Sequence, residues 1–298
     1  MTTPQNHISD RLRVVGVAIF FLLYSLLGTQ LTLAAPTVIN YSGSDLAVDK
    51  RNSYHVALLD LVLSKAGIQY ELRPNRRNMV TARAWAQLEA EEDISVLWGT
   101  TIPELEMRLL PVRIPIDKGI LGWRLFLIKA RDRDLFENIH TLDQLKSLLA
   151  GQQSDWADTS ILRANGLKVI GVSDSRSLYP MLAADRFQYF PRGVGEIWVE
   201  QKTHSALGLE IEQHLALHYP VNSYFFVSRK NPQLAQWITR GLRAAIKDGS
   251  LDKLFDQYNG EAIRRAGLNA RIVFDLNNPF MTTVPTDATQ QRDDLIQR

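Results

Sequence analysis

Apolar residues from position 37 onward follow two alternating periodicities. Thr37–Tyr41 is a short β-rich run that ends at Ser42, and Gly67 is placed to end a helix. The helix is indicated by one apolar stripe, formed by Tyr54, Ala57, Leu58, Leu61 and Val62. A strand at Tyr70–Arg73, a helix at Met79–Ala90 and a strand at Ile94–Leu97 follow. This βαβαβ order with short links predicts a parallel sheet with right-handed crossovers.

The same alternation recurs between residues 120 and 220 and predicts a second α/β core. Gly119–Lys129 is a long apolar run that contains one charge, Arg124, and predicts a strand. Asp158 or Thr159 is placed to cap a helix that ends near Ala164. The other predicted elements here are helices at Leu142–Leu149 and Leu178–Ala184 and strands at Lys168–Gly171 and Phe187–Phe190.

The last third of the chain predicts a strand, two helices and a tail. Asn222–Ser228 predicts the strand, an apolar stripe from Leu234 to Ile246 predicts a long helix, and Leu251–Tyr258 predicts a short one. Residues 281–298 are polar and without periodicity, which is typical of a disordered tail.

Composition excludes several classes of protein. The chain has 298 residues, with 34 Lys and Arg against 32 Asp and Glu, so it lacks the basic surplus of a nucleic-acid binder. It has no cysteine, which excludes disulfides, thiolate metal sites and a cysteine nucleophile. His214 and His218 are the one helix-spaced histidine pair, and no acidic third ligand is near them in the sequence. We therefore expect neither a metal nor a cofactor.

Residues 1–35 have the order of a secretory signal. Arg11 and Arg13 precede the uncharged run Val14–Leu27, and small residues follow at Ala34 and Ala35. The sequence therefore predicts a cleaved signal peptide and a periplasmic mature protein. The alternative is an uncleaved anchor, because the stretch from Val14 to Ala35 approaches the length that spans a bilayer.

Three segments in order resemble the type II periplasmic solute-binding proteins, in particular family 3, the amino-acid-type substrate-binding domains of ABC transporters. They are Lys118–Gly122, then Leu178–Ala183 followed by Asp185–Tyr189, and finally Phe225–Arg229 with Lys247–Leu254. The match in order and spacing runs from residue 37 to about residue 258.

This resemblance implies an α/β fold of two lobes that close on a solute held between them. It assigns residues 36–118 and 222–280 to the first lobe and residues 119–221 to the second, with crossings near 116–121 and 218–223. The expected partners are a small-molecule ligand and an ABC permease or a membrane sensor, and the expected state is a monomer.

The resemblance also predicts that this chain departs from the family at the ligand. Family members clamp the α-carboxylate of an amino acid with an arginine where this chain has Leu105, and Arg108 one turn later is the one substitute. They bind the ammonium with an aspartate where this chain has Arg192-Gly193, and no acid follows until Glu196. Standard α-amino acids are therefore expected to bind weakly.

Eight residues are candidates for contact with the solute. Strand ends of a parallel sheet face the ligand crevice, and these eight lie at such ends or carry a charge within a strand. They are Ser42, Trp98, Thr100, Arg124, Trp156, Asp158, Arg192 and Glu196. If Arg124 and Arg192 converge, the ligand is anionic. The alternatives are a solvated strand face or a structural ion pair for Arg124, core packing for Trp156 and a surface turn for Arg192.

A solute-binding protein for transport or sensing is the function that the sequence favours. The alternative is an enzyme on the same scaffold, similar to cyclohexadienyl dehydratases, with Glu196 or Asp158 as the base. No nucleophile elbow, P-loop or dinucleotide fingerprint is present in the sequence.

Overall fold

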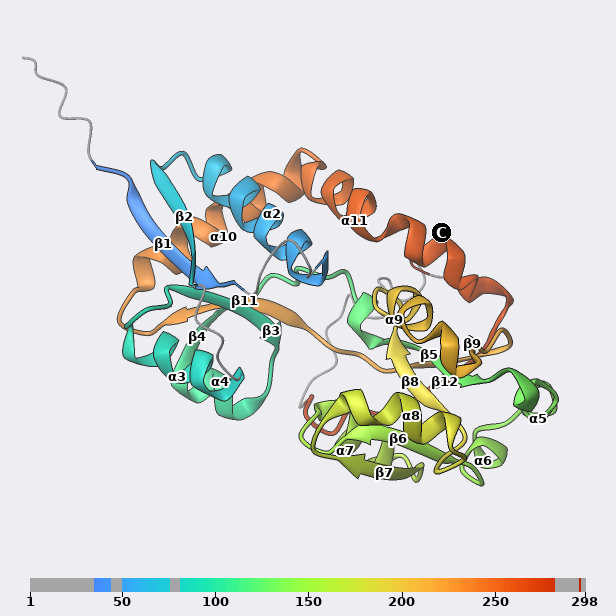
Figure 1. Ribbon diagram of the computed structural model, residues 1–298. Coiled ribbons are helices and arrows are strands. Elements are labelled where there is room, and N and C mark those ends of the chain that lie inside the picture. Colours follow the sequence, from blue (N-terminus) through green and yellow to red (C-terminus); the bar gives the residue numbers. More distant parts are fainter. Residues whose placement is uncertain (1–34, 44–49, 76–80, 282–294, 296–298) are drawn as a thin grey trace, which may run out of the picture. The chain divides into compact units, whose positions relative to one another are not determined.

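The computed structural model describes residues 35–43, 50–75, 81–281 and 295. Its first sheet has five strands in the order β2-β1-β3-β11-β4 (Figure 1). β1 is parallel to β2 and β3, whereas β11 is antiparallel to β3 and β4. The strands are β1 (Thr37–Ser42), β2 (Tyr70–Asn75), β3 (Val96–Thr100), β4 (Leu109–Val112) and β11 (Ser223–Ser228). The predicted parallel βαβαβ unit is therefore present, and β11 extends it.

Helices cover both faces of the first sheet. α2, α10 and α11 pack against one another on one face, and α3 and α4 lie on the other (Figure 1). The backbones of α10 and α2 approach closely at Gly241, where an added Cβ would lie 1.9 Å from the carbonyl oxygen of Val62. The bounds are α2 (Lys50–Lys65), α3 (Thr81–Ala90), α4 (Pro103–Arg108), α10 (Pro232–Lys247) and α11 (Ser250–Ala266).

A second sheet has the order β12-β10-β5-β8, and β9 also pairs with β5. Its strands are β5 (Trp123–Lys129), β8 (Phe190–Gly193), β9 (Leu209–Ile211), β10 (Leu215–His218) and β12 (Ile272–Asp275). A two-stranded parallel sheet of β6 (Leu149–Gln153) and β7 (Lys168–Val172) adjoins β8 through a bridge between Ala150 and Tyr189. The helices of this half are α5 (Arg133–Glu137), α6 (Leu142–Leu145), α7 (Ala157–Ala164), α8 (Leu178–Ala183) and α9 (Ile197–Thr203).

Two segments carry the chain from the first sheet to the second and back, as the sequence predicted. They lie side by side, because the Ile116 amide donates to the Ser223 carbonyl at 3.1 Å and the Tyr219 amide donates to the Gly122 carbonyl at 3.2 Å. A Cβ at Gly122 would lie 2.1 Å from the carbonyl oxygen of Tyr219, so this close approach requires glycine.

A third connection corrects the predicted lobe boundary. Residues 222–280 were assigned to the first lobe, but β12 within that range pairs in parallel with β10 of the second sheet. The chain reaches it because α11 ends at Ala266, eight residues beyond the predicted end at Tyr258. Its buried positions Gly260, Ile263 and Ala266 continue the apolar side of the helix, and the glycine hid that continuation in the sequence.

Two predicted strands differ in their starts. The strand expected from Gly119 begins at Trp123, because Ile120–Gly122 forms a 3₁₀ turn after left-handed Gly119. The strand expected over Phe187–Phe190 is instead Phe190–Gly193, since Pro191 did not suggest a strand. Trp156 rather than Asp158 or Thr159 is the N-cap of α7.

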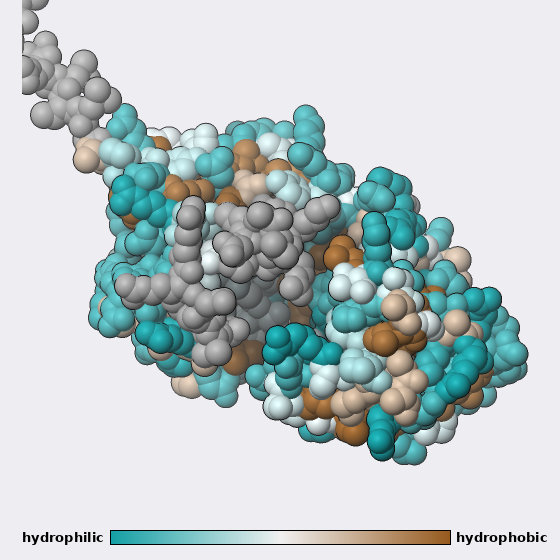
Figure 2. Space-filling view, viewed as in Figure 1, coloured by the Kyte–Doolittle hydropathy of each residue, from teal (hydrophilic) through white to brown (hydrophobic). Residues whose placement is uncertain are grey.

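The predicted signal peptide lies outside the described residues except for Ala35. Of the predicted tail, Met281 and Leu295 are described, and Leu295 is 2% exposed within the first core, so at that position the expected disorder is not seen. Within the described ranges, no helix has the length and apolar character needed to cross a bilayer. Hydrophilic residues predominate on the face seen in Figure 2, and the hydrophobic ones form small separate groups.

Candidate functional site

Arg124 on β5 and Asp158 in the first turn of α7 form a partly buried ion pair. Arg124 Nε donates to Asp158 Oδ1 at 2.6 Å, and the two side chains are 12% and 20% exposed. Arg124 Nη1 donates to the carbonyls of Leu121 and Trp123, and the guanidinium lies 5.2 Å from the centre of the Tyr219 ring. The Tyr219 hydroxyl also donates to Asp158 Oδ1. One carboxylate oxygen therefore accepts from both an arginine and a tyrosine.

The charge states of this pair follow from burial and from mutual attraction. Burial raises the pKa of Asp158, but the charge and hydrogen bond of Arg124 and the Tyr219 hydroxyl outweigh it, so that pKa lies below its usual range. Burial also raises the pKa of Tyr219, which keeps its proton and can donate. Asp158 is therefore ionised at neutral pH. Because a carboxylate with a lowered pKa takes up a proton only weakly, it is a poor candidate for a general base.

Arg192 on β8 is held by two glutamates of the next helix. Its Nε and Nη2 donate to the two carboxylate oxygens of Glu200, both at 2.6 Å, and Nη2 also donates to Glu196. The guanidinium lies 4.8 Å from the centre of the Trp156 ring and 4.9 Å from that of Phe190. The Arg192 side chain is 8% exposed. Its planar fork is thus matched by a carboxylate from within the chain.

These groups form one network, because β5 and β8 are neighbours with Arg124 opposite Gly193 and Leu125 opposite Arg192. The charge of Glu196 also acts on Arg124. A Cβ at Gly193 would lie 2.8 Å from Glu196 Oε1, so glycine leaves room for that carboxylate. We call Arg124, Asp158, Arg192, Glu196, Glu200 and Tyr219 the ion network. Five of the eight candidates lie in it or against it: Arg124, Trp156, Asp158, Arg192 and Glu196.

Both arginines have carboxylate partners within the chain. Arg124 has the structural ion pair that the sequence left as its alternative, and Arg192 is a buried strand residue with two carboxylate partners instead of an exposed turn residue. Glu200 and Tyr219 were missed. Glu200 belongs to α9, which was not predicted, although its spacing of four from Glu196 places both acids on one helix face.

Ser42, Trp98 and Thr100 form a second group at the ends of β1 and β3. The two strands are parallel neighbours, with Tyr41 opposite Val96, so their ends lie at the same edge of the first sheet. Trp98 is half-buried and stacks on His55 with ring centres 5.4 Å apart and planes 13° apart. The sequence offered no sign of His55.

His55 in turn contacts the first crossing segment. Its Nε2 lies 2.8 Å from Asp117 Oδ1, and the adjacent Tyr54 hydroxyl donates to the Ile116 carbonyl at 2.6 Å. Asp117 is 4% exposed. Trp98, which was predicted to contact the solute, is therefore linked through His55 to Asp117 in the segment that joins the two sheets.

The family's carboxylate clamp is missing at both positions considered. Leu105 is buried in the small core under α3 and α4 with Leu97 and Phe226. Arg108 does not replace it. Its Nε and Nη2 both donate to Glu89, at 2.8 and 2.5 Å, and both side chains are exposed.

The predicted histidine pair does not lie on a helix. His218 ends strand β10 and its Nδ1 lies 2.9 Å from Asp275 Oδ1, whereas His214 precedes that strand, 3.6 Å from Glu137. No group of three or more His, Asp or Glu side chains in the described part of the chain is arranged to hold a metal ion.

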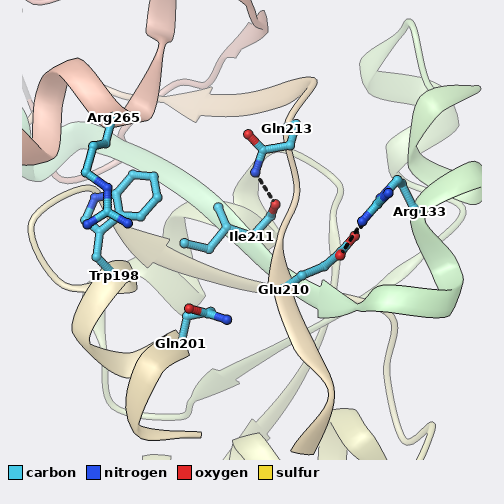
Figure 3. A pocket seen from close by; sticks show the side chains of 7 residues that line it. All are labelled: Arg133, Trp198, Gln201, Glu210, Ile211, Gln213 and Arg265. Carbon is cyan, nitrogen blue, oxygen red and sulfur yellow. Dashed lines mark hydrogen bonds and ion pairs between the residues drawn. The ribbon is translucent and has the colours of Figure 1, made fainter. Parts of the chain in front are cut away.

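A separate polar pocket of about 240 Å³ lies between α9, α11 and the strand β9 (Figure 3). Arg265 covers the Trp198 ring at 4.1 Å, and Arg133 donates to both oxygens of Glu210 at 2.9 and 2.6 Å. None of the eight candidates lines this pocket; its lining is Arg133, Trp198, Gln201, Glu210, Ile211, Gln213 and Arg265.

Comparison with known proteins finds similar structures but no match to a family model or to a curated protein. An ancestral arginine-binding protein bound to glutamine is similar, with a TM-score of 0.54 and 17% identity over 76% of this chain and 100% of that one. A periplasmic binding protein of Salmonella typhimurium with high arginine specificity also has a TM-score of 0.54, with 12% identity over 75% of this chain and all of that one.

A third similar structure is the GluR0 ligand-binding core from Nostoc punctiforme in complex with L-glutamate, with a TM-score of 0.50 and 13% identity over 75% of this chain and 99% of that one. The chain has the two-lobed fold of these binding proteins. The predicted α/β fold class is therefore confirmed. In this fold the first sheet with Trp98 and the second sheet with the ion network belong to different lobes.

Proposed function

We propose that this protein is a periplasmic solute-binding protein that holds one small molecule between its two lobes. The observation that carries the proposal is the fold, which is shared with structures whose bound molecules are arginine, glutamine and glutamate. The two crossing segments, which lie side by side at residues 116 and 223, support it further, because hinge closure around a ligand needs such connections.

The proposed contacts come from both sheets. Trp98, Ser42 and Thr100 would meet the solute from the first lobe, and Trp156, Asp158, Arg124, Arg192 and Glu196 from the second. Ends of parallel strands are the usual place for ligands in such sheets. The two tryptophans are the large apolar surfaces among these residues, so a solute with a planar or apolar part suits the site.

The chemistry at Leu105 and Arg108 argues against a standard α-amino acid. A zwitterion would lack the guanidinium that pairs with its α-carboxylate, since Leu105 is apolar and Arg108 is bound to Glu89. An anionic solute, which the sequence suggested, would share Arg124 and Arg192 with the carboxylates that are already hydrogen-bonded to them.

Export and partners complete the proposal. Residues 1–35 would direct the chain to the periplasm and be removed, and the loaded protein would deliver its solute to an ABC permease or signal to a membrane sensor. Mass spectrometry of the periplasmic fraction should find a mature N-terminus at Ala35 or Pro36, whereas a full-length chain found only in membranes would contradict this part.

A thermal-shift screen of residues 36–298 against a library of small metabolites tests the binding function. A solute at 100 times its dissociation constant stabilises the folded state by about 2.7 kcal/mol, which is readily detected. Binding should also reduce the radius of gyration in small-angle X-ray scattering as the lobes close. A library without a single stabilising solute would contradict the proposal.

A further inference from the structure

The polar pocket between α9, α11 and β9 is separate from the candidate solute site. None of the eight candidate residues lines it. Its volume of about 240 Å³ is below the roughly 300–1,000 Å³ of sites for drug-sized molecules, so it suits a small molecule. Figure 3 shows the pair of Trp198 and Arg265 and the pair of Glu210 and Arg133 on opposite sides of the pocket.

The charge on the Arg133 side of the pocket is balanced within the chain. Arg133 Nε and Nη2 donate to the two carboxylate oxygens of Glu210 at 2.9 and 2.6 Å. The charges of Glu137 and Asp134 also act on this guanidinium. This side of the pocket therefore has no surplus of positive charge to offer a ligand.

Arg265 on the other side has no acidic partner. Its guanidinium lies 4.1 Å from the centre of the Trp198 ring, and no carboxylate of the described residues lies within ion-pair distance of it. The N–H groups of a guanidinium lie in its plane, so contact with an aromatic ring leaves their edge directed outward. The ring thus holds a long side chain in place while its donors remain available to a ligand.

Trp198 adds a second donor that lacks an acceptor. Its Nε1 is buried and has no hydrogen-bond partner among the described residues. Buried donors in folded proteins nearly always have an acceptor. A positive charge without an acid and an indole N–H without an acceptor therefore lie in contact at one side of the pocket, and both call for an acceptor.

The amides of Gln201 and Gln213 complete the polar lining. Each donates one N–H to a backbone carbonyl of β9, Gln201 to Leu209 at 3.2 Å and Gln213 to Ile211 at 2.5 Å. An amide has a second N–H and an oxygen, so these two side chains suit either kind of polar group. They add hydrogen-bonding capacity without adding charge.

We propose that this pocket binds the oxyanion of a small molecule, a carboxylate or a phosphate, through the guanidinium of Arg265. A guanidinium binds either group with two parallel N–H donors. Gln201, Gln213 and the apolar Ile211 line the space for the rest of the molecule. The inference does not depend on the proposed function, because the pocket shares no residue with the candidate solute site.

Nuclear magnetic resonance of the purified, isotope-labelled protein tests the site through the indole N–H signal of Trp198, which Trp198→Phe identifies by its loss. The anionic probes are inorganic phosphate and butanedioate, and butane-1,4-diamine is the cationic control. At least one anion should shift this signal saturably, with an affinity that falls as sodium chloride is added, while the diamine leaves it in place. The tighter of the two anions identifies the kind of oxyanion.

Two neighbouring arginines provide a matched pair of variants. Arg265→Gln removes the unpaired cation and should weaken the binding of the anion at least tenfold. Arg264→Gln removes an equal charge from the adjacent exposed residue of α11, which does not line the pocket, so it should leave the affinity unchanged.

Four results would overturn the inference. They are no saturable shift with either anion, an equal shift with the diamine, an affinity that Arg265→Gln leaves unchanged, and an equal loss of affinity in both variants. The first can be read from the parent protein alone, so it decides the matter even if a variant fails to fold.

Discussion

Replacing Arg124 by methionine should destabilise the protein by leaving Asp158 buried without its cation. Methionine keeps the length of the side chain and its apolar stem. The two partners are 12% and 20% exposed, and the carboxylate retains only the Tyr219 hydroxyl as a side-chain donor. Breaking one partner of a buried pair costs about 3–5 kcal/mol, and partial exposure here places the value near 3.

Thermal unfolding of Arg124→Met, Asp158→Asn and the double variant measures this. For a chain of this size 1 kcal/mol corresponds to roughly 2–4 °C, so Arg124→Met should melt roughly 6–12 °C below the parent. Adding Asp158→Asn should recover at least half of that loss, because the unpaired charge is removed. Arg73→Met, which breaks an exposed pair with Glu71, should leave the melting temperature unchanged. A loss below about 1 kcal/mol for Arg124→Met, or an additive double variant, would refute the reasoning.

Three further predictions follow from other contacts. Gly122→Ala places a Cβ against the Tyr219 carbonyl at 2.1 Å and should cost about 1–3 kcal/mol in urea unfolding; an unchanged midpoint would show that the crossing segments separate easily. Burial raises the pKa of Asp158, but Arg124 lowers it by more, so the folded-state pKa lies below the unfolded one. The ionised Asp158 therefore stabilises the fold fully above about pH 4, and this contribution is lost as the pH falls through the folded-state pKa. Asp158→Asn should make the loss of stability in acid less steep, and an equally steep loss in the variant would contradict the assignment. Glutamine and other standard α-amino acids would lack the charge-assisted hydrogen bond of a guanidinium to their carboxylate, worth about 1.5–3 kcal/mol, so calorimetry should find them bound at least about tenfold more weakly than the preferred solute, and micromolar binding would overturn this.

The sequence predicted those parts of the fold that have strong local patterns. β1, α2 and α10 have apolar residues at clear strand or helix spacing, and each was placed to within a few residues. β6 and α9 were missed because their buried positions depend on partners far along the chain. β6 contains Gly151 and two glutamines, and α9 has only seven residues with Val199 exposed.

The sequence singled out the candidate residues, but it did not reveal the charged partners that they have in the structure. Arg124 was singled out because a lone charge inside an apolar strand demands an explanation, and that explanation is an ion pair with a residue 34 positions away. Tyr219, which is 61 positions from Asp158, had no local sign of its role. The position of a residue at a strand end can be read from the sequence. Which opposite charge it pairs with depends on residues far along the chain, so the sequence does not show which charges are neutralised within the protein.

Calorimetric titration of one solute into matched variants of the two lobes tests the central claim most directly. The solute is the one with the largest thermal shift, and the variants are Trp98→Ala in the first lobe and Trp156→Ala in the second. We expect one molecule bound per chain and at least a tenfold loss of affinity in each variant. Binding that one of these substitutions leaves unchanged would contradict capture of the solute between the two lobes.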